Sequence, residues 1–213
     1  MSHAPVILIG AGGHALVVLD ALLQSRRNVL GLVDIDPGMR GRRLLGIEVL
    51  GDEGVLARHA PRSVQLVNGI GSTASLARRR GVYERLSAAG YEFIGVVHAS
   101  AILSPHAKVA GSAQIMAGAV VQTHAEVGEN SIVNTGATID HGCAIGAHVH
   151  VAPGVTLSGN VTIGDGSHVG AGATVIQGIT IGASCTIAAG ALVVGSFPPG
   201  AHVAGVPARE TRA

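Results

Sequence analysis

Two different spacings of hydrophobic residues divide the chain near residue 96. In the first part, apolar runs at residues 5–10 and 28–36 lie on either side of a segment, 14–26, whose leucines fall on one helical face. These leucines are Leu16, Leu19, Leu22 and Leu23. A strand, a helix and a second strand within about 30 residues make a βαβ unit, which predicts a parallel sheet.

The rest of the first part continues this alternation. Residues 63–72 predict a strand that ends in a glycine turn, and residues 73–90 predict a helix with a basic outer face that ends at Gly90. Residues 91–98 predict a last strand. We therefore expect residues 1–96 to form a small Rossmann-like α/β domain with a parallel sheet.

From Val97 the spacing changes to a repeat of six residues. Ile, Leu or Val occupies all seventeen positions reached from residue 97 to residue 193 in steps of six. Four residues after each of them stands mostly Ala, Ser, Val or Cys, and Gly, Asn or His often stands between. Each hexad predicts a short strand and a corner, so three hexads close one triangular coil of a parallel β-helix. We expect this β-helix over residues 97–198 and a C-terminal cap over residues 199–213.

Composition and charge fit thin, regular layers. Glycine is abundant, at 32 residues, while Trp is absent and only two Phe and two Tyr occur. The net charge of +1 argues against general nucleic-acid binding, which favours a basic stripe. No apolar run is long enough to span a membrane and no secretory leader is recognisable, so we expect a cytoplasmic protein without membrane insertion.

The β-helix region carries a polar cluster between residues 140 and 150. Asp140, His141, His148 and His150 interrupt a run of Gly, Ala, Ile, Val and Thr. Histidine exchanges protons near neutral pH, so His141, two residues after the inward Ile139, is a candidate general base. A structural place on an exposed corner is the alternative for His141. For Asp140, a corner role competes with that of a carboxylate that orients the imidazole.

A glycine loop follows the first predicted strand. Gly10, Gly12 and Ala15 satisfy a G-x-G-x-x-A pattern, and Asp34 follows at the end of the second strand. Backbone N–H groups at a helix start bind phosphate, but this pattern does not say whose phosphate. A nicotinamide dinucleotide fits the pattern in isolation, although the domain is short for a full dinucleotide fold. A nucleotide-linked substrate is the alternative.

These motifs together resemble a known family. The hexapeptide prism resembles the left-handed β-helix acyltransferases, which use acetyl-CoA or acyl carrier protein. Five motifs narrow the resemblance to bacterial nucleotide-sugar N-acetyltransferases of glycan (O-antigen and lipopolysaccharide) biosynthesis. They are GAGGH at 10–14, VDID at 33–36, NGIGS at 68–72, DH at 140–141 and GVPAR at 205–209. The resemblance covers essentially the whole chain and implies a left-handed prism, a homotrimer with active sites between subunits, acetyl-CoA as co-substrate, and no metal.

The same resemblance implies roles for individual residues. It places the catalytic base at His141, preceded by Asp140, and a candidate oxyanion donor at Gly159, one coil along the prism. Acetyl-CoA should also contact His150. Because residues 97–213 hold only three Lys or Arg, Arg209 in the cap is the candidate for the CoA diphosphate, and a solvated tail charge is the alternative. The residues expected to bind the nucleotide sugar are Gly12, Gly13, His14, Asp34, Asp36, Asn68, Gly69, Gly71 and Asn134. Among these, Asp34 or Asp36 should accept from the base or the ribose.

The expected reaction is acetyl transfer to the 4-amino group of a nucleotide-linked amino-deoxy sugar, with GDP-perosamine favoured and a UDP-linked 4-amino sugar next. One alternative is O-acetylation of a sialic acid, and another is a sugar-nucleotide sensor without catalysis. A third is a zinc hydratase similar to the gamma-class carbonic anhydrases. Eight histidines from His98 onward suggest the hydratase, but three of them would have to meet at one zinc ion.

Overall fold

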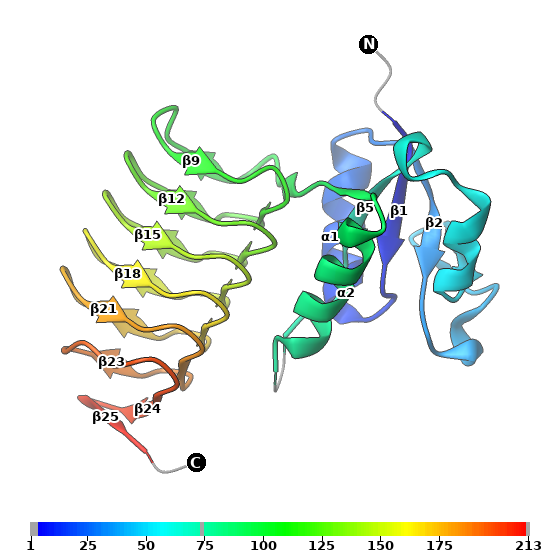
Figure 1. Ribbon diagram of the computed structural model, residues 1–213. Helices are drawn as coiled ribbons and strands as arrows, with labels where there is room; N and C mark the ends of the chain where they lie inside the picture. The colour runs from blue at the N-terminus through cyan, green and yellow to red at the C-terminus, as the bar shows by residue number, and fades with distance from the viewer. Residues whose placement is uncertain (1–3, 73–74, 212–213) are drawn as a thin grey trace. The chain divides into compact units, whose positions relative to one another are not determined.

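The computed structural model describes residues 4–72 and 75–211. The chain forms two compact units, with the boundary between Ala99 and Ser100 (Figure 1). The first unit contains the helices, and the second is a stack of short strands. No helix in the described part of the chain is long and apolar enough to cross a membrane.

The first unit is built on a six-stranded sheet in the order β3-β4-β2-β1-β5-β6. Its strands are β1 (Val6–Ile9), β2 (Val29–Val33), β3 (Arg43–Leu44), β4 (Ile47–Gly51), β5 (Gln65–Asn68) and β6 (Glu92–Phe93), and β7 (Val96–Val97) follows them. Neighbouring strands are parallel except β3 and β4, which are antiparallel. The parallel sheet is confirmed, and the β3–β4 hairpin falls in a stretch for which the hydrophobic pattern made no prediction.

Helical elements cover this sheet. They are α1 (Gly13–Gln24), α2 (Ala77–Ala88) and three 3-10 helices, η1 (Pro37–Met39), η2 (Glu53–Arg58) and η3 (Pro61–Ser63). Ile7 and Ile9 of β1 belong to one buried cluster with Val82 of α2. Leu8 points to the opposite face because side chains alternate along a strand. Both Leu8 and Ala15 of α1 lie beside Gly69, in the loop after β5.

Two details of the helix predictions are wrong. On α1, Leu19 and Leu22 are buried as expected, but Leu16 is 39% exposed, because the buried stripe runs through the smaller Ala15 and Val18 instead. On α2, the arginines do not all face solvent, since Arg79 is buried at 1% exposure. The predicted helix over 73–90 begins at Ala77 in the structure, and residues 73 and 74 lie outside the described residues.

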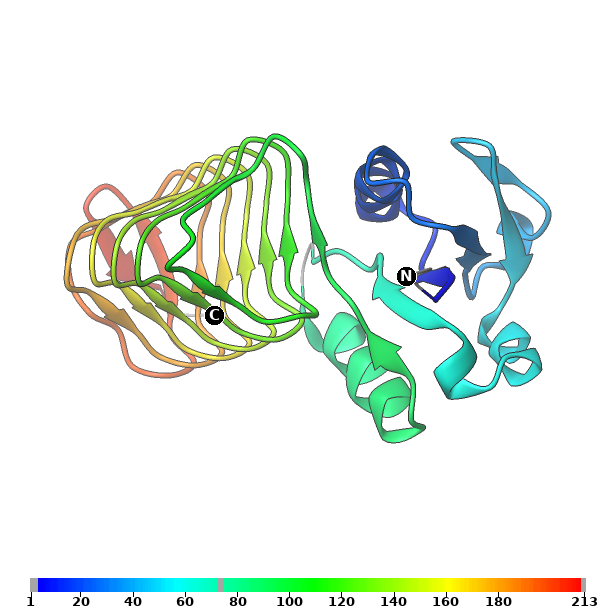
Figure 2. The same ribbon diagram turned by 90° about the horizontal axis from the view of Figure 1, so that it is seen from above.

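The second unit is a parallel β-helix of two-residue strands that stack in three sheets (Figure 2). One sheet contains β10 (Gln114–Ile115), β13 (Ile132–Val133), β16 (His150–Val151), β19 (His168–Val169) and β22 (Thr186–Ile187). The second contains β8 (Ile102–Leu103), β11 (Val120–Val121), β14 (Thr138–Ile139), β17 (Thr156–Leu157), β20 (Thr174–Val175) and β23 (Leu192–Val193). The third contains β9 (Lys108–Val109), β12 (Glu126–Val127), β15 (Ala144–Ile145), β18 (Thr162–Ile163) and β21 (Thr180–Ile181).

The six-residue repeat accounts for the core and for the corners. The predicted aliphatic is the second residue of every strand, and from Ile115 to Val193 each one is buried. At the first coil the side chains are less covered, and Val97 is 47% exposed. From Gly118 to Gly190 the corner residue three positions after the aliphatic has a positive φ, for example +58° at His124 and +53° at Asn130. Gly, Asn and His recur at these corners because they adopt the left-handed conformation most readily.

The prism ends in a hairpin. β24 (His202–Gly205) pairs in parallel with β22, and β25 (Ala208–Glu210) pairs with β24 in antiparallel. The chain therefore has the expected fold class, a small Rossmann-like α/β unit followed by a left-handed parallel β-helix.

Candidate active site

His141 stands exposed on the corner that joins β14 to β15. Its backbone N–H donates to Asp140 Oδ1 at 2.7 Å, and its carbonyl accepts from the Asn160 N–H of the next coil at 2.8 Å. The carboxylate of Asp140 thus holds the backbone of the corner. The main chain at His141 is fixed by both bonds, while its imidazole faces outward.

Glycine makes room for this imidazole. A Cβ atom added to Gly159 would lie 2.5 Å from both Cε1 and Nε2 of His141, so the ring lies directly over this glycine of the next coil. The residue after the histidine is Gly142, which has φ +68° and would bring a Cβ against the side-chain oxygen of Asn160. These constraints favour glycine directly after His141.

A thiol lies beneath the same corner. Cys143 is buried, and its Sγ–H donates to the Ser158 carbonyl at 3.1 Å. Burial raises the pKa of the Cys143 thiol above its ordinary value, so the thiol stays protonated at neutral pH. Cys143 is therefore unsuited to act as a nucleophile.

A second polar group lies on another side of the coil. Asn134, on the connection from β13 to β14, places its Nδ2 3.0 Å from Nε2 of His150. His150 is buried, and β16 pairs with β19 so that His150 stands opposite His168. The two rings meet edge to face with their centroids 4.9 Å apart. The spacing of eighteen residues, one full coil, accounts for this contact.

The structure brings some predicted residues together and separates others. The side chains of Asn134 and His150 are hydrogen-bonded, and the ring of His141 lies against Gly159. Asn134, however, precedes β14 and His141 follows it, so the two groups occupy different corners of one triangular coil. One chain alone does not gather them into a single site.

In the first unit, the glycine loop opens α1 as predicted. Gly10 has φ +97° and donates its N–H to the Val33 carbonyl, which ties the end of β1 to β2. Gly12 and Gly13 are exposed, and a Cβ added to either would meet open space. Packing therefore does not require these two glycines, and the first N–H groups of a 12-residue helix face outward beside His14.

The loop after β5 lies against this helix start. A Cβ on Gly69 would come within 2.9 Å of Ala15 Cβ, and one on Gly71 within 3.0 Å of His14 Cβ. A residue that binds the nucleotide sugar is expected to face outward, but Asn68 is buried, with 2% of its surface exposed. Its amide donates to the Arg79 carbonyl at 3.0 Å and accepts from the Ile70 N–H at 3.2 Å.

The side chain of Arg79 adds further hydrogen bonds to this loop, a role that the sequence did not predict. Its Nη1 donates to the carbonyls of Asn68 at 2.9 Å and Ile70 at 2.7 Å. Complete burial lowers the pKa of Arg79 from its ordinary value to about 9. A run of three arginines on a predicted surface helix gave no signal that the middle one turns inward.

Asp34 holds the other side of the glycine loop. Its Oδ2 accepts from the Ala11 N–H at 2.7 Å and its Oδ1 from the Asp36 N–H at 2.9 Å. Asp34 and Asp36 line a pocket of about 210 Å³, together with Arg40, which directly follows η1, and Arg58, the last residue of η2. The two arginines fall in a stretch for which the sequence pattern made no prediction.

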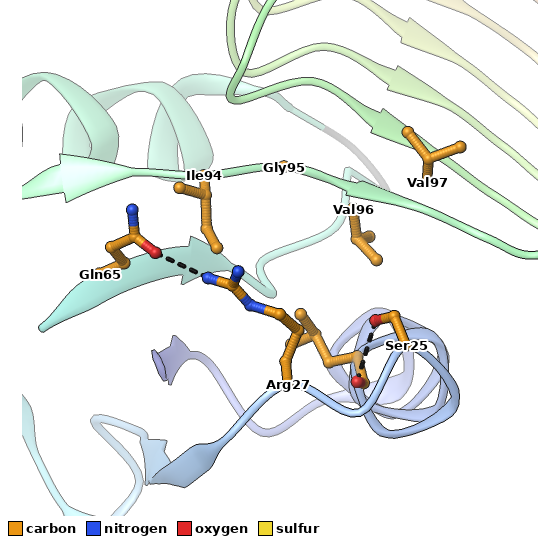
Figure 3. Close-up of a pocket in the computed structure, with 8 residues that line it drawn as sticks. Ser25, Arg27, Gln65, Ile94, Gly95, Val96 and Val97 are labelled. Atoms are coloured by element: carbon orange, nitrogen blue, oxygen red, sulfur yellow. Dashed lines mark hydrogen bonds between the residues drawn. The ribbon is translucent and has the colours of Figure 1, made fainter. Parts of the chain in front are cut away.

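Another pocket, of about 350 Å³, lies at the opposite end of the same sheet (Figure 3). Arg27 and Gln65 line it, at the amino ends of β2 and β5. Arg27 Nη2 donates a hydrogen bond to Gln65 Oε1 at 2.6 Å. Ligands of open α/β sheets bind at the carboxyl ends of the strands. The pocket at Asp34, beside the glycine loop, is the one that satisfies this rule.

Arg209 lies exposed on β25, in the terminal hairpin, and its Nη1 donates to the Ala208 carbonyl at 2.8 Å. Four successive strand pairings separate β16, the strand of His150, from β25. At about 4.8 Å per pairing, this is about 19 Å along the prism. Over the ranges 4–72 and 75–211, no group of three or more His, Cys, Asp or Glu side chains is arranged to hold a metal ion.

Two family models match the chain. One, described as the PglD N-terminal domain, matches residues 5–86. The other, described as bacterial transferase hexapeptide (six repeats), matches residues 124–159 and 160–195. No significant match is found among curated proteins.

Several solved structures are similar over nearly the whole chain. A histidine-to-alanine mutant of GDP-perosamine N-acetyl transferase from Caulobacter crescentus, in complex with CoA and GDP-perosamine, is 33% identical; the match covers 99% of this chain and 98% of that one, with a TM-score of 0.91. The acetyltransferase domain of PglB from Neisseria gonorrhoeae FA1090, in complex with acetyl coenzyme A, is 34% identical over 98% of this chain and 100% of that one, with a TM-score of 0.87. WeeI from Acinetobacter baumannii AYE matches over 98% of this chain and 100% of its own, with a TM-score of 0.87. Because it is only 23% identical, this match supports the fold alone.

Proposed function

Because the chain belongs to the hexapeptide-repeat sugar N-acetyltransferases, which use acetyl-CoA, we propose that it acetylates the 4-amino group of a nucleotide-linked amino-deoxy sugar. GDP-perosamine is the favoured acceptor, since a relative that is 33% identical binds it, and a UDP-linked 4-amino sugar is next. The single observation that carries the proposal is the corner at His141. There an exposed imidazole with a fixed backbone lies over a glycine of the next coil.

The proposed reaction is direct transfer with His141 as general base. The amine nitrogen attacks the thioester carbon, and the carbonyl electron pair moves onto oxygen. His141 accepts the proton that the nitrogen loses, and the backbone N–H of Gly159 donates to the oxyanion. Collapse of this intermediate breaks the carbon–sulfur bond, and the CoA thiolate leaves and takes up a proton. Asp140 acts through the main chain, because its carboxylate holds the N–H of His141.

The acceptor nucleotide is proposed to bind the first unit. Its diphosphate would meet the N–H groups of Gly12, Gly13 and His14 at the start of α1, where the helix dipole favours an anion. The base and ribose would enter the pocket at Asp34 and Asp36. Gly69 and Gly71 would close the phosphate site, held in place by Asn68.

Acetyl-CoA is proposed to lie along the prism. Arg209 is about 19 Å along the prism from the level of His150, comparable with the extended arm of CoA, and can meet its phosphates. His150 would lie near the thioester, with Asn134 beside it. His150 lies on β16, whereas His141 lies on the corner between β14 and β15. We therefore propose that one site needs two chains, and that the protein is a homotrimer in the cytoplasm.

The test is thiol release from acetyl-CoA by the purified protein with a panel of GDP- and UDP-linked amino sugars. His141→Asn should lower the rate at least about 100-fold, the usual contribution of a general base. His148→Asn is the matched control, because His148 is also a corner histidine, with φ +57°, which Asn tolerates. An unchanged rate in His141→Asn would refute the base, and release with a sialic acid but with no amine would refute N-acetylation.

A further inference from the structure

The amide of Asn134 has a determined orientation. The Thr135 N–H donates to Asn134 Oδ1 at 2.8 Å, so the oxygen faces the following residue. The amide nitrogen then faces Nε2 of His150 at 3.0 Å. An amide nitrogen only donates, so Nε2 must be the acceptor and carry no proton. A ring that accepts at Nε2 is neutral and has its proton on Nδ1.

The surroundings of His150 favour the same uncharged state. His150 is 6% exposed, and the edge-to-face partner ring, His168, is half-buried. Burial lowers the pKa of His168, so this neighbour is also neutral near pH 7. Two neutral rings 4.9 Å apart avoid the repulsion that two imidazolium ions would suffer there.

We propose that Asn134 is a positioning residue that holds His150 as the neutral tautomer protonated on Nδ1. This rests on the proposed function, in which His150 lies beside the thioester. His150 cannot take a proton at Nε2 without losing the bond from Asn134. His150 therefore presents an uncharged surface to the acetyl group and leaves proton acceptance to His141. The assignment differs from direct contact between Asn134 and the acceptor sugar.

The prism contains a matched pair for comparison. Asn130 places its Nδ2 3.0 Å from Nδ1 of His148, so by the same rule His148 is protonated on Nε2. Two histidines two residues apart are thus expected as opposite tautomers. Asn130 has no part in the proposed site, and its φ of +53° suits Asp as well as Asn.

The first measurement is ¹⁵N NMR of the histidine rings in the full-length protein near pH 7, with the His150 signals identified from their loss in His150→Gln. We expect Nδ1 to be protonated and Nε2 unprotonated. In Asn134→Asp the carboxylate can only accept, so Nε2 should become protonated, while Asn130→Asp should alter His148 alone. A protonated Nε2 in the wild type, or no change in Asn134→Asp, would overturn the proposal. This readout needs no turnover, so it decides the tautomer even if no amino sugar is acetylated.

The second measurement separates action through His150 from direct contact with the sugar. Asn134→Asp should lower kcat/KM for acetyl-CoA about tenfold, and Asn130→Asp should not. In a His150→Gln background, Asn134→Asp should add less than about twofold, because interacting residues are not additive. An equal loss in both backgrounds would show that Asn134 acts on the acceptor directly, and would overturn the positioning role.

Discussion

At the scale of single residues, the candidate base depends on an absent side chain. The ring of His141 occupies the space that a Cβ on Gly159 would fill, 2.5 Å from Cε1 and Nε2. Gly159→Ala should push the imidazole aside and lower kcat up to about 100-fold, since a displacement of about 1 Å can cost that much. The Tm should change little, because the ring is an exposed side-chain end that can move.

The control for this substitution is Gly111→Ala. Gly111 also lies on the prism, but a Cβ there meets open space. Circular dichroism and thermal melts would be recorded alongside the rates. A fully active Gly159→Ala protein would contradict the placement of the ring.

The buried thiol allows a second prediction at this scale. Because burial raises the pKa of Cys143, little thiolate exists at pH 7 to 8. Cys143→Ala should keep its rate of acetyl transfer, and a thiol reagent should modify the folded protein far more slowly than the unfolded chain. Rapid modification that abolishes activity would indicate a reactive cysteine instead.

At the scale of elements, α2 holds the loop that follows β5. The guanidinium of Arg79 is bound to the carbonyls of Asn68 and Ile70, and burial lowers its pKa to about 9. Arg79→Met should free this loop, because both carbonyls lose their donor. We expect KM for the nucleotide sugar to rise about tenfold and KM for acetyl-CoA to stay unchanged. The exposed neighbour serves as control in Arg78→Met, and equal increases in both KM values would contradict the assignment.

The sheet of the prism that carries His168 should respond to acid. Burial lowers the pKa of His168 in the folded protein, whereas the unfolded chain keeps the ordinary value of 6.5. Between these two values the unfolded state binds more protons, so stability falls as pH drops through 6.5. Tm should therefore be lower at about pH 5.5 than at about pH 7.5. This drop in Tm should be smaller in His168→Gln than in His106→Gln, the control at an exposed histidine.

At the scale of the whole molecule, periodic features were predictable and irregular ones were not. A six-residue repeat sets strand, core position and corner together, so Val193 was placed inside and Gly159 beside His141 from spacing alone. The burial of Arg79 depends on carbonyls in a distant loop, which local pattern does not encode. The pocket with Arg40 and Arg58 depends on two short 3-10 helices that leave no hydrophobic rhythm.

The corners of the prism also predict how many chains make one site. His141 follows β14, while Asn134, hydrogen-bonded to His150, precedes it. In the proposed trimer, the two groups would therefore meet across neighbouring subunits. His141→Asn and His150→Gln proteins, each of low activity, should therefore complement one another when they are unfolded and refolded together. In a trimer mixed at random, about a quarter of the sites receive both native histidines, so up to about a quarter of the wild-type rate should return.

Mixing the two variants without unfolding them is the control, because subunits that do not exchange cannot form new sites. The mass of the assembly, measured by light scattering, should be that of three chains in every sample. If the refolded mixture is no more active than the average of its components while the trimer forms, each site lies within one chain. In that case Asn134 and His150 would act away from the base, and the corner at His141 with Gly159 would have to serve the reaction alone.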